Sequence, residues 1–99
     1  MLKSGQRRHP VDRETAETIA AQGLAFLTAD AQRLQRFLAL TGLQPAELRT
    51  RLGSSEVLAA ALSFLAADES LLLTFAASHH VAPEAIAAAL ARLDGADGQ

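Results

Sequence analysis

The fold is decided by residues 21–52, AQGLAFLTADAQRLQRFLALTGLQPAELRTRL, which recur without a gap as residues 59–90, AAALSFLAADESLLLTFAASHHVAPEAIAAAL. At this fixed offset of 38 positions, eleven residues are identical, including the pairs Phe26/Phe64, Asp30/Asp68, Phe37/Phe75 and Pro45/Pro83. A repeat of this length is typical of a supersecondary unit that cannot bury its apolar face alone and packs against its copy.

The repeated unit is expected to be helical. Ala, Leu, Arg, Glu and Gln dominate the chain, and no run of residues alternates with the period of two that marks a strand. A first helix should begin after Asp12, an acceptable N-cap, and run to about Ala29. Asp30 and Asp68 are predicted to cap the next helix of each copy, and these helices should end near residues 41 and 78.

Turn residues place a third, short helix at the end of each copy. Gly42 can supply the left-handed residue that ends a helix, and Pro45 and Pro83 suit the first helical position, where a missing N–H costs nothing. Gly53 should close the first unit, and Ser54 or Ser55 should cap its successor. Gly23, within the first helix, indicates a position where a small residue is required.

The expected architecture is therefore all-α: a compact bundle of about six helices, built from two three-helix repeats at about 14–53 and 54–93. The helix over 57–67 is apolar on nearly every side, which is typical of a central helix. Residues 11–93 are expected to form a single helical domain. Residues 1–10 are predicted to be a mobile basic arm, and residues 94–99 a frayed tail.

The charges are distributed unevenly. The net charge is −2, but residues 1–52 carry +3 and residues 53–99 carry −5. Such bipolarity can steer a partner or favour head-to-tail self-association. It is equally the pattern that an ordinary solvated surface can acquire, and the sequence leaves both interpretations open.

Composition also indicates the cellular compartment. The chain has no cysteine, which excludes disulfides and sulfur-based zinc sites. Its longest apolar stretch, residues 57–67, is well short of the roughly 20 residues that cross a membrane. No apolar region follows the basic N-terminus, so a secretory signal is not indicated. A cytoplasmic protein without a membrane partner is predicted.

Differences between the copies indicate candidate partner surfaces. Arg33 corresponds to Leu71, and Gln35 to Leu73, so copy two has a run of three leucines that no single helical face can bury. Either the rest of the chain covers them, or they form a surface for a partner. Arg33 and Arg36 share a helix face, and Arg49 and Arg51 lie on the nearby short helix. These four arginines either bind a phosphate- or carboxylate-bearing partner or only solubilise the surface.

Catalysis is not predicted. The histidines are His9, in the expected arm, and the adjacent pair His79-His80, and no Asp or Glu stands at the helical spacing that would complete a metal site. No glycine-rich phosphate loop is present, and no serine or threonine stands beside a base. We therefore predict no catalytic, cofactor or metal-binding residues, no cofactor and no small-molecule substrate.

Nucleic-acid binding is the alternative, because residues 38–52 and 76–90 each resemble a helix-turn-helix. A recognition helix needs several basic or amide side chains. The second candidate presents none, and the first offers only Arg49 and Arg51. The acidic net charge also weighs against this alternative.

Two motifs carry a family resemblance. The first is Ala25-Phe26-Leu27 followed by residues 36–43, RFLALTGL, and residues 45–49, PAELR; the second is residues 64–69, FLAADE, followed by residues 71–76, LLLTFA. In this order they resemble an uncharacterised family of small alphaproteobacterial proteins, a domain of unknown function. The resemblance covers about residues 14–93 and implies a compact all-helical fold in a bacterial cytoplasm. Members of that family tend to have Gly where this chain has His80. The residue that caps the helix before Val81 therefore departs from the family's pattern.

The resemblance brings no activity with it. The function expected from the residues is a non-catalytic protein-interaction or regulatory module that binds a protein partner or a second copy of itself. A small nucleic-acid-associated protein is the alternative, and an enzyme is third.

Overall fold

Helices make up most of the chain between residues 11 and 94, which are the residues that the computed structural model describes. Within this range there are six: α1 (Arg13–Thr28), α2 (Ala31–Thr41), α3 (Pro45–Thr50), α4 (Ser55–Ala66), α5 (Glu69–His79) and α6 (Pro83–Leu93). The all-α prediction is confirmed. The predicted arm over 1–10 and residues 95–99 of the predicted tail lie outside the described residues.

The N-terminal caps of the helices are those expected. The Asp12 carboxylate accepts a hydrogen bond from the Thr15 amide, and Asp30 and Asp68 do the same for amides in the first turns of α2 and α5. Ser54 caps α4 by accepting from the amide of Val57. Each cap satisfies an N–H group that has no partner within its own helix.

Two left-handed residues end α2 and α5. Gly42 has φ +77° and donates its N–H to the Leu38 carbonyl, as predicted. His80 has φ +56° and donates its N–H to Ala76, so the second helix ends in the same way although a side chain is present. Pro45 and Pro83 stand at the first position of α3 and α6.

One expectation about helix length was wrong. The third helix of each copy was predicted to be short, but only α3 is, with 6 residues, whereas α6 has 11. Burial explains the difference, because Ile86, Ala89 and Leu93 of α6 are buried, and α3 buries only Leu48. Gly53 follows α3, whereas Ala91, the residue 38 positions later, lies within α6. Glycine favours a helix less than alanine does.

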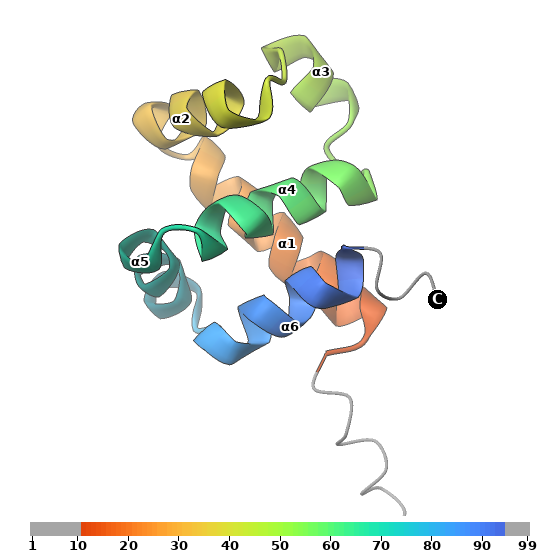
Figure 1. The fold of residues 1–99 in the computed structure, drawn as a ribbon, viewed down its shortest axis with the longest axis vertical. Coiled ribbons are helices and arrows are strands. Elements are labelled where there is room, and N and C mark those ends of the chain that lie inside the picture. Colours follow the sequence, from red (N-terminus) through yellow and green to blue (C-terminus); the bar gives the residue numbers. More distant parts are fainter. Residues whose placement is uncertain (1–10, 95–99) are drawn as a thin grey trace, which may run out of the picture.

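The core forms where α1 and α4 cross (Figure 1). Helix α6 packs against both, α2 packs on α1, and α5 packs on α4. Helix α4 therefore has the central position that its apolar sequence predicted, and α1 shares it. Two aromatic pairs link the halves of the chain: Phe26 with Phe75, at 5.4 Å between ring centroids, and Phe37 with Phe64, at 5.6 Å.

The small residue at Gly23 lets α1 approach α4. A Cβ added there would lie 3.0 Å from the Leu65 Cδ1 atom and 3.4 Å from Leu62 Cδ2. The sequence predicted a tight approach at this position, and the neighbours are leucine side chains of α4.

Within residues 11–94, no single helix is both long enough and apolar enough to cross a membrane. Helices α4 and α5 reach that length and apolar character only when they are taken together, and they are bent by 112° at their junction.

Candidate functional site

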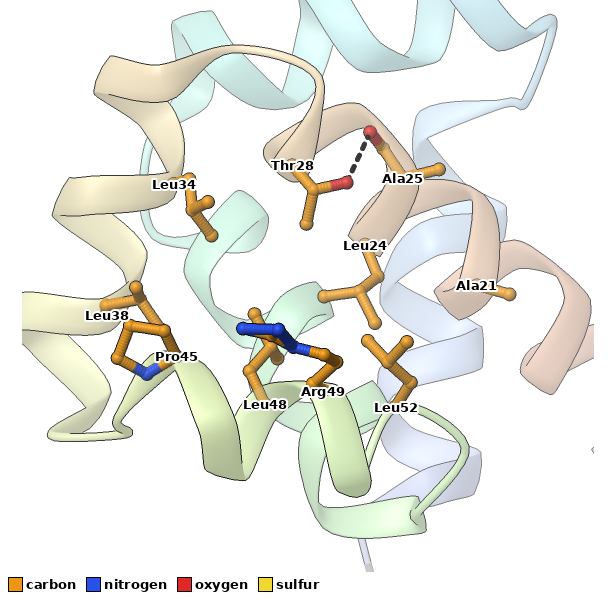
Figure 2. A pocket seen from close by; sticks show the side chains of 10 residues that line it. All are labelled: Ala21, Leu24, Ala25, Thr28, Leu34, Leu38, Pro45, Leu48, Arg49 and Leu52. Atoms are coloured by element: carbon orange, nitrogen blue, oxygen red, sulfur yellow. Dashed lines mark hydrogen bonds between the residues drawn. The ribbon is translucent and has the colours of Figure 1, made fainter.

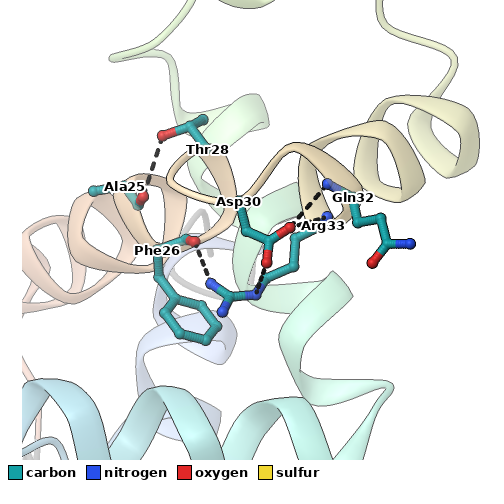
Figure 3. Close-up of polar contacts among 6 residues, drawn as sticks. All are labelled: Ala25, Phe26, Thr28, Asp30, Gln32 and Arg33. Atoms are coloured by element: carbon teal, nitrogen blue, oxygen red, sulfur yellow. Dashed lines mark hydrogen bonds and ion pairs between the residues drawn. The ribbon is translucent and has the colours of Figure 1, made fainter.

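Arg33, one of the candidate partner residues, is held by its own chain (Figure 3). Its guanidinium carbon lies 4.0 Å from the centroid of the Phe26 ring, and its Nη1 donates to the Phe26 carbonyl at 2.8 Å. Its Nε lies 3.7 Å from the Asp30 carboxylate. A guanidinium can make these contacts together because it stacks through its face and donates through its edge. Arg33 thus joins the end of α1 to the start of α2.

Two further candidate arginines also have carboxylate partners. Arg36 of α2 lies 3.6 Å from Asp68, the cap of α5, and its guanidinium carbon is 5.7 Å from the Phe64 centroid. Arg51 pairs with Glu56 of α4. These arginines connect neighbouring helices, so they are less available to an external anion than the sequence suggested.

The candidate leucines of α5 have different environments. Leu71 is half-buried and packs against the hydrophobic core, whereas Leu73 is 47% exposed. Leu71 is partly covered by the rest of the chain, and Leu73 lies on the surface.

An open cleft with a volume of about 580 Å³ lies between α1, α2 and α3. Its lining is almost entirely apolar (Figure 2): Ala21, Leu24, Ala25, Thr28, Leu34, Leu38, Pro45, Leu48, Arg49 and Leu52. Leu24 and Leu48 are buried, and Leu52, just after α3, is 44% exposed. A volume of this size is within the range of about 300–1,000 Å³ found for ligand-binding sites.

Two polar side chains line this α1–α2–α3 cleft. The Thr28 hydroxyl donates to the Ala25 carbonyl one turn earlier in α1, so its proton already has an acceptor. Arg49 of α3 is exposed, and its side chain extends along the cleft among the leucines. Of the four candidate arginines, Arg49 alone lines this cleft.

The cleft borders α3, which has 6 residues, whereas α6 has 11. In the other half of the chain, α6 lies across α1 and α4 and buries its inner face. Leu90, which aligns with Leu52 at the offset of 38 residues, is only partly exposed there. Sequence reasoning identified the start of α3 but missed the cleft. The available signal was Gly53, which aligns with Ala91 at the offset of 38 residues and follows the end of α3 at Thr50.

The histidines are placed by packing and by backbone geometry. The His79 ring lies 4.9 Å from that of Phe75 and 6.0 Å from that of Phe26, centroid to centroid. His80 is the left-handed residue that ends α5. Among the residues that the structure describes, no group of three or more His, Cys, Asp or Glu could hold a metal ion.

The pKa of the Asp12 carboxyl is shifted by its neighbours. The hydrogen bonds from the backbone and side chain of Thr15 lower the pKa of the Asp12 carboxyl below its ordinary value of 3.8, and the positive charge of Arg92 acts in the same direction. Asp12 caps α1, so this effect belongs to helix formation and not to a reactive centre.

A second, smaller hollow of about 360 Å³ lies against α4 and the end of α6, lined in part by Glu56, Ser63 and Asp94. Unlike the α1–α2–α3 cleft, it is lined by several polar side chains and no arginine. The cleft is therefore the better candidate site.

Comparison with known proteins identifies a family but no activity. The model of a family described as "Protein of unknown function (DUF3572)" matches residues 13–96. No curated protein and no solved structure shows significant similarity to the chain.

Proposed function

The chain belongs to this family of proteins of unknown function, DUF3572, and we propose that it is a non-catalytic protein-interaction module that docks a partner in the α1–α2–α3 cleft. The observation that carries the proposal is an apolar cleft with buried Leu24 and Leu48 at its base and the 44%-exposed Leu52 at its rim. A large leucine left exposed beside an apolar hollow is typical of a surface that another molecule covers.

The side chains around the cleft support binding rather than chemistry. Thr28 donates to a backbone carbonyl, and Arg49 supplies a positive charge; the lining includes no histidine and no carboxylate. Nucleophilic or acid–base catalysis needs a base within hydrogen-bond reach of the reacting group. The lining of the cleft offers no such pair.

We attribute the cleft to an internal duplication that has diverged in its third helix. Both α2 and α5 begin at an aspartate cap and end at a left-handed residue, with 38 positions between the equivalent residues. The aromatic pair Phe26–Phe75 becomes the pair Phe64–Phe37 when each residue is exchanged for its equivalent at that offset. In this interpretation α6 covers its half of the core, and the shorter α3 leaves the corresponding space open to a partner.

The nucleic-acid alternative gains no support from the geometry. It depended on Arg49 and Arg51 as the basic side chains of a recognition helix. Groove recognition requires basic side chains that extend together from one face of the recognition helix. Here Arg49 lines the cleft and Arg51 pairs with Glu56, so the two side chains have separate environments. We retain the protein-interaction proposal, with the bacterial cytoplasm as its expected setting.

The proposal can be tested by closing the cleft. Ala25 lines it and is exposed, so Ala25→Phe should fill it without entering the core. Ala39, an exposed alanine of α2 that does not line the cleft, gives the matched control Ala39→Phe. We expect the apolar dye 8-anilinonaphthalene-1-sulfonate to bind the wild type and Ala39→Phe saturably and to lose its fluorescence enhancement with Ala25→Phe.

Binding of a protein partner should depend on the cleft in the same way as binding of the dye. A host protein retained by the wild type and by Ala39→Phe should not be retained by Ala25→Phe. Equal dye binding by all three folded proteins, or no saturable binding by any of them, would remove the cleft as the working surface.

A further inference from the structure

Arg49 differs from the other exposed arginines among the described residues. Arg13, Arg36 and Arg51 form ion pairs with Glu17, Asp68 and Glu56, respectively. Arg49 makes no ion pair within residues 11–94, although it is exposed and lies along an apolar cleft. A cation beside a largely apolar hollow is complementary to a ligand that carries an apolar group and a carboxylate close together.

The outer face of α5 carries such a pair. Glu69 and Leu73 are both exposed and lie four residues apart, so they are neighbours on one face of the helix. Leu73 is 47% exposed, and Glu69 makes no ion pair within the described range. Ala77, four residues further on, is also exposed and small, so the face has one protruding leucine with an acid one turn before it.

We infer that the partner in the cleft is a second copy of this chain, whose α5 inserts Leu73 among the leucines while its Glu69 pairs with Arg49. This inference rests on the proposed function of the cleft. It corresponds to the recognition mode in which a helix lies in a groove and anchors by residues one turn apart. Because the two surfaces differ, the contact is heterologous, joining the cleft of one copy to α5 of the next.

The electrostatic match is local to the two paired residues. The charge of +3 on residues 1–52 comes from Lys3, Arg7 and Arg8, whereas residues 11–52, which form the cleft, carry five basic and five acidic residues. Arg49 and Glu69 have opposite charges, so their attraction favours this contact over one that brings like charges together. The association should therefore weaken as salt is added, because these charges are exposed to solvent.

One leucine and one ion pair make a small interface, so the association should be weak and reversible. Sedimentation velocity on the full chain, from about 10 µM to about 1 mM, should show a mass that rises with concentration. Leu73→Asp and Arg49→Glu should each remain monomeric over that range. Leu40→Asp is the matched control, because Leu40 is 73% exposed but does not line the cleft, and it should associate like the wild type.

Mixing the two monomeric variants gives the decisive result. Leu73→Asp keeps an intact cleft and Arg49→Glu keeps an intact α5, so their mixture should form a one-to-one complex that neither forms alone. The double variant Arg49→Glu with Glu69→Arg reverses the ion pair and should recover association. Circular dichroism of each variant shows whether its helices are retained.

Three results would each overturn the inference: a wild type that stays monomeric throughout the range, association unchanged by Leu73→Asp or by Arg49→Glu, or a mixture that forms no complex. The dye experiment keeps the two proposals apart. A cleft that binds the dye in a chain that does not self-associate would end the second-copy inference and leave the interaction module standing.

Discussion

At the scale of single residues, the ends of the helices are explained by local chemistry. Carboxylates and a serine satisfy the first amides of four helices, and left-handed residues end two of them. The side-chain caps and the left-handed Gly42 depend on chemistry within a single turn, which is why the sequence alone placed them correctly. The left-handed conformation of His80 was not predicted.

Substitutions at the two left-handed residues, Gly42 and His80, should change the free energy of unfolding in opposite directions. Gly42→Ala should lower the free energy of unfolding by about 1 kcal/mol, because an L-residue is strained at φ +77°. A new Cβ there would meet no atom within 4 Å, so packing would not obscure the effect. His80→Gly should raise the free energy of unfolding by a similar amount, about 1 kcal/mol, because it removes the same strain.

Urea titrations of both variants against the wild type measure these changes. If Gly42→Ala were neutral and His80→Gly destabilising, these results would contradict the left-handed conformations of the two residues.

The Asp12 cap gives a prediction about pH. Its pKa is lower in the folded chain than the ordinary 3.8, so the stability that it supplies is present above about pH 4 and is lost as the pH falls through the folded-state pKa. Asp12→Asn should therefore be less stable than the wild type at neutral pH, and the difference should shrink in acid. Thermal melts of the two proteins between neutral pH and pH 3 would show this convergence. A difference that stayed constant across the range would contradict the charged cap.

At the scale of elements, the two faces of α5 separate core from surface. Leu71→Asp should destabilise the fold by about 1–3 kcal/mol, because Leu71 packs against the core and the new carboxylate would lose water there. Leu73→Asp, two residues away, should change the free energy of unfolding by less than about 0.5 kcal/mol, because Leu73 is on the surface. Denaturant unfolding of the two variants makes the comparison, and equal losses would place both leucines in the core.

The elements also show how far sequence reasoning reaches. Helix starts at Asp30, Asp68, Pro45 and Pro83 were predictable because caps and prolines act locally. The length of α6 was not, because its last turn is stabilised by burial of Leu93, which no local pattern reports. Four arginines were identified as a surface feature, but the partners of three of them, such as Phe26 for Arg33 and Asp68 for Arg36, depend on how the helices are brought together.

At the scale of the whole molecule, α3 and α6 differ in how much of the core they cover, and the candidate site lies beside α3. Helix α6 packs against α1 and α4, whereas α3 buries only Leu48 and leaves the cleft between itself, α1 and α2. The central claim is therefore that Leu52 and Leu90, which stand 38 positions apart, differ in their access to solvent. Leu52 forms the open rim, and Leu90 lies on the covered side.

Relaxation of leucine methyl groups by a soluble paramagnetic agent tests this claim most directly, at a concentration low enough for the chain to be monomeric. Leu40 serves as the exposed reference and Leu65 as the buried one, since they are 73% and 0% exposed. The account predicts that the Leu52 methyls relax more slowly than those of Leu40 but faster than those of Leu65, and that the Leu90 methyls are better protected than the Leu52 methyls. Leu52 methyls as protected as those of Leu65, or no difference between Leu52 and Leu90, would contradict it.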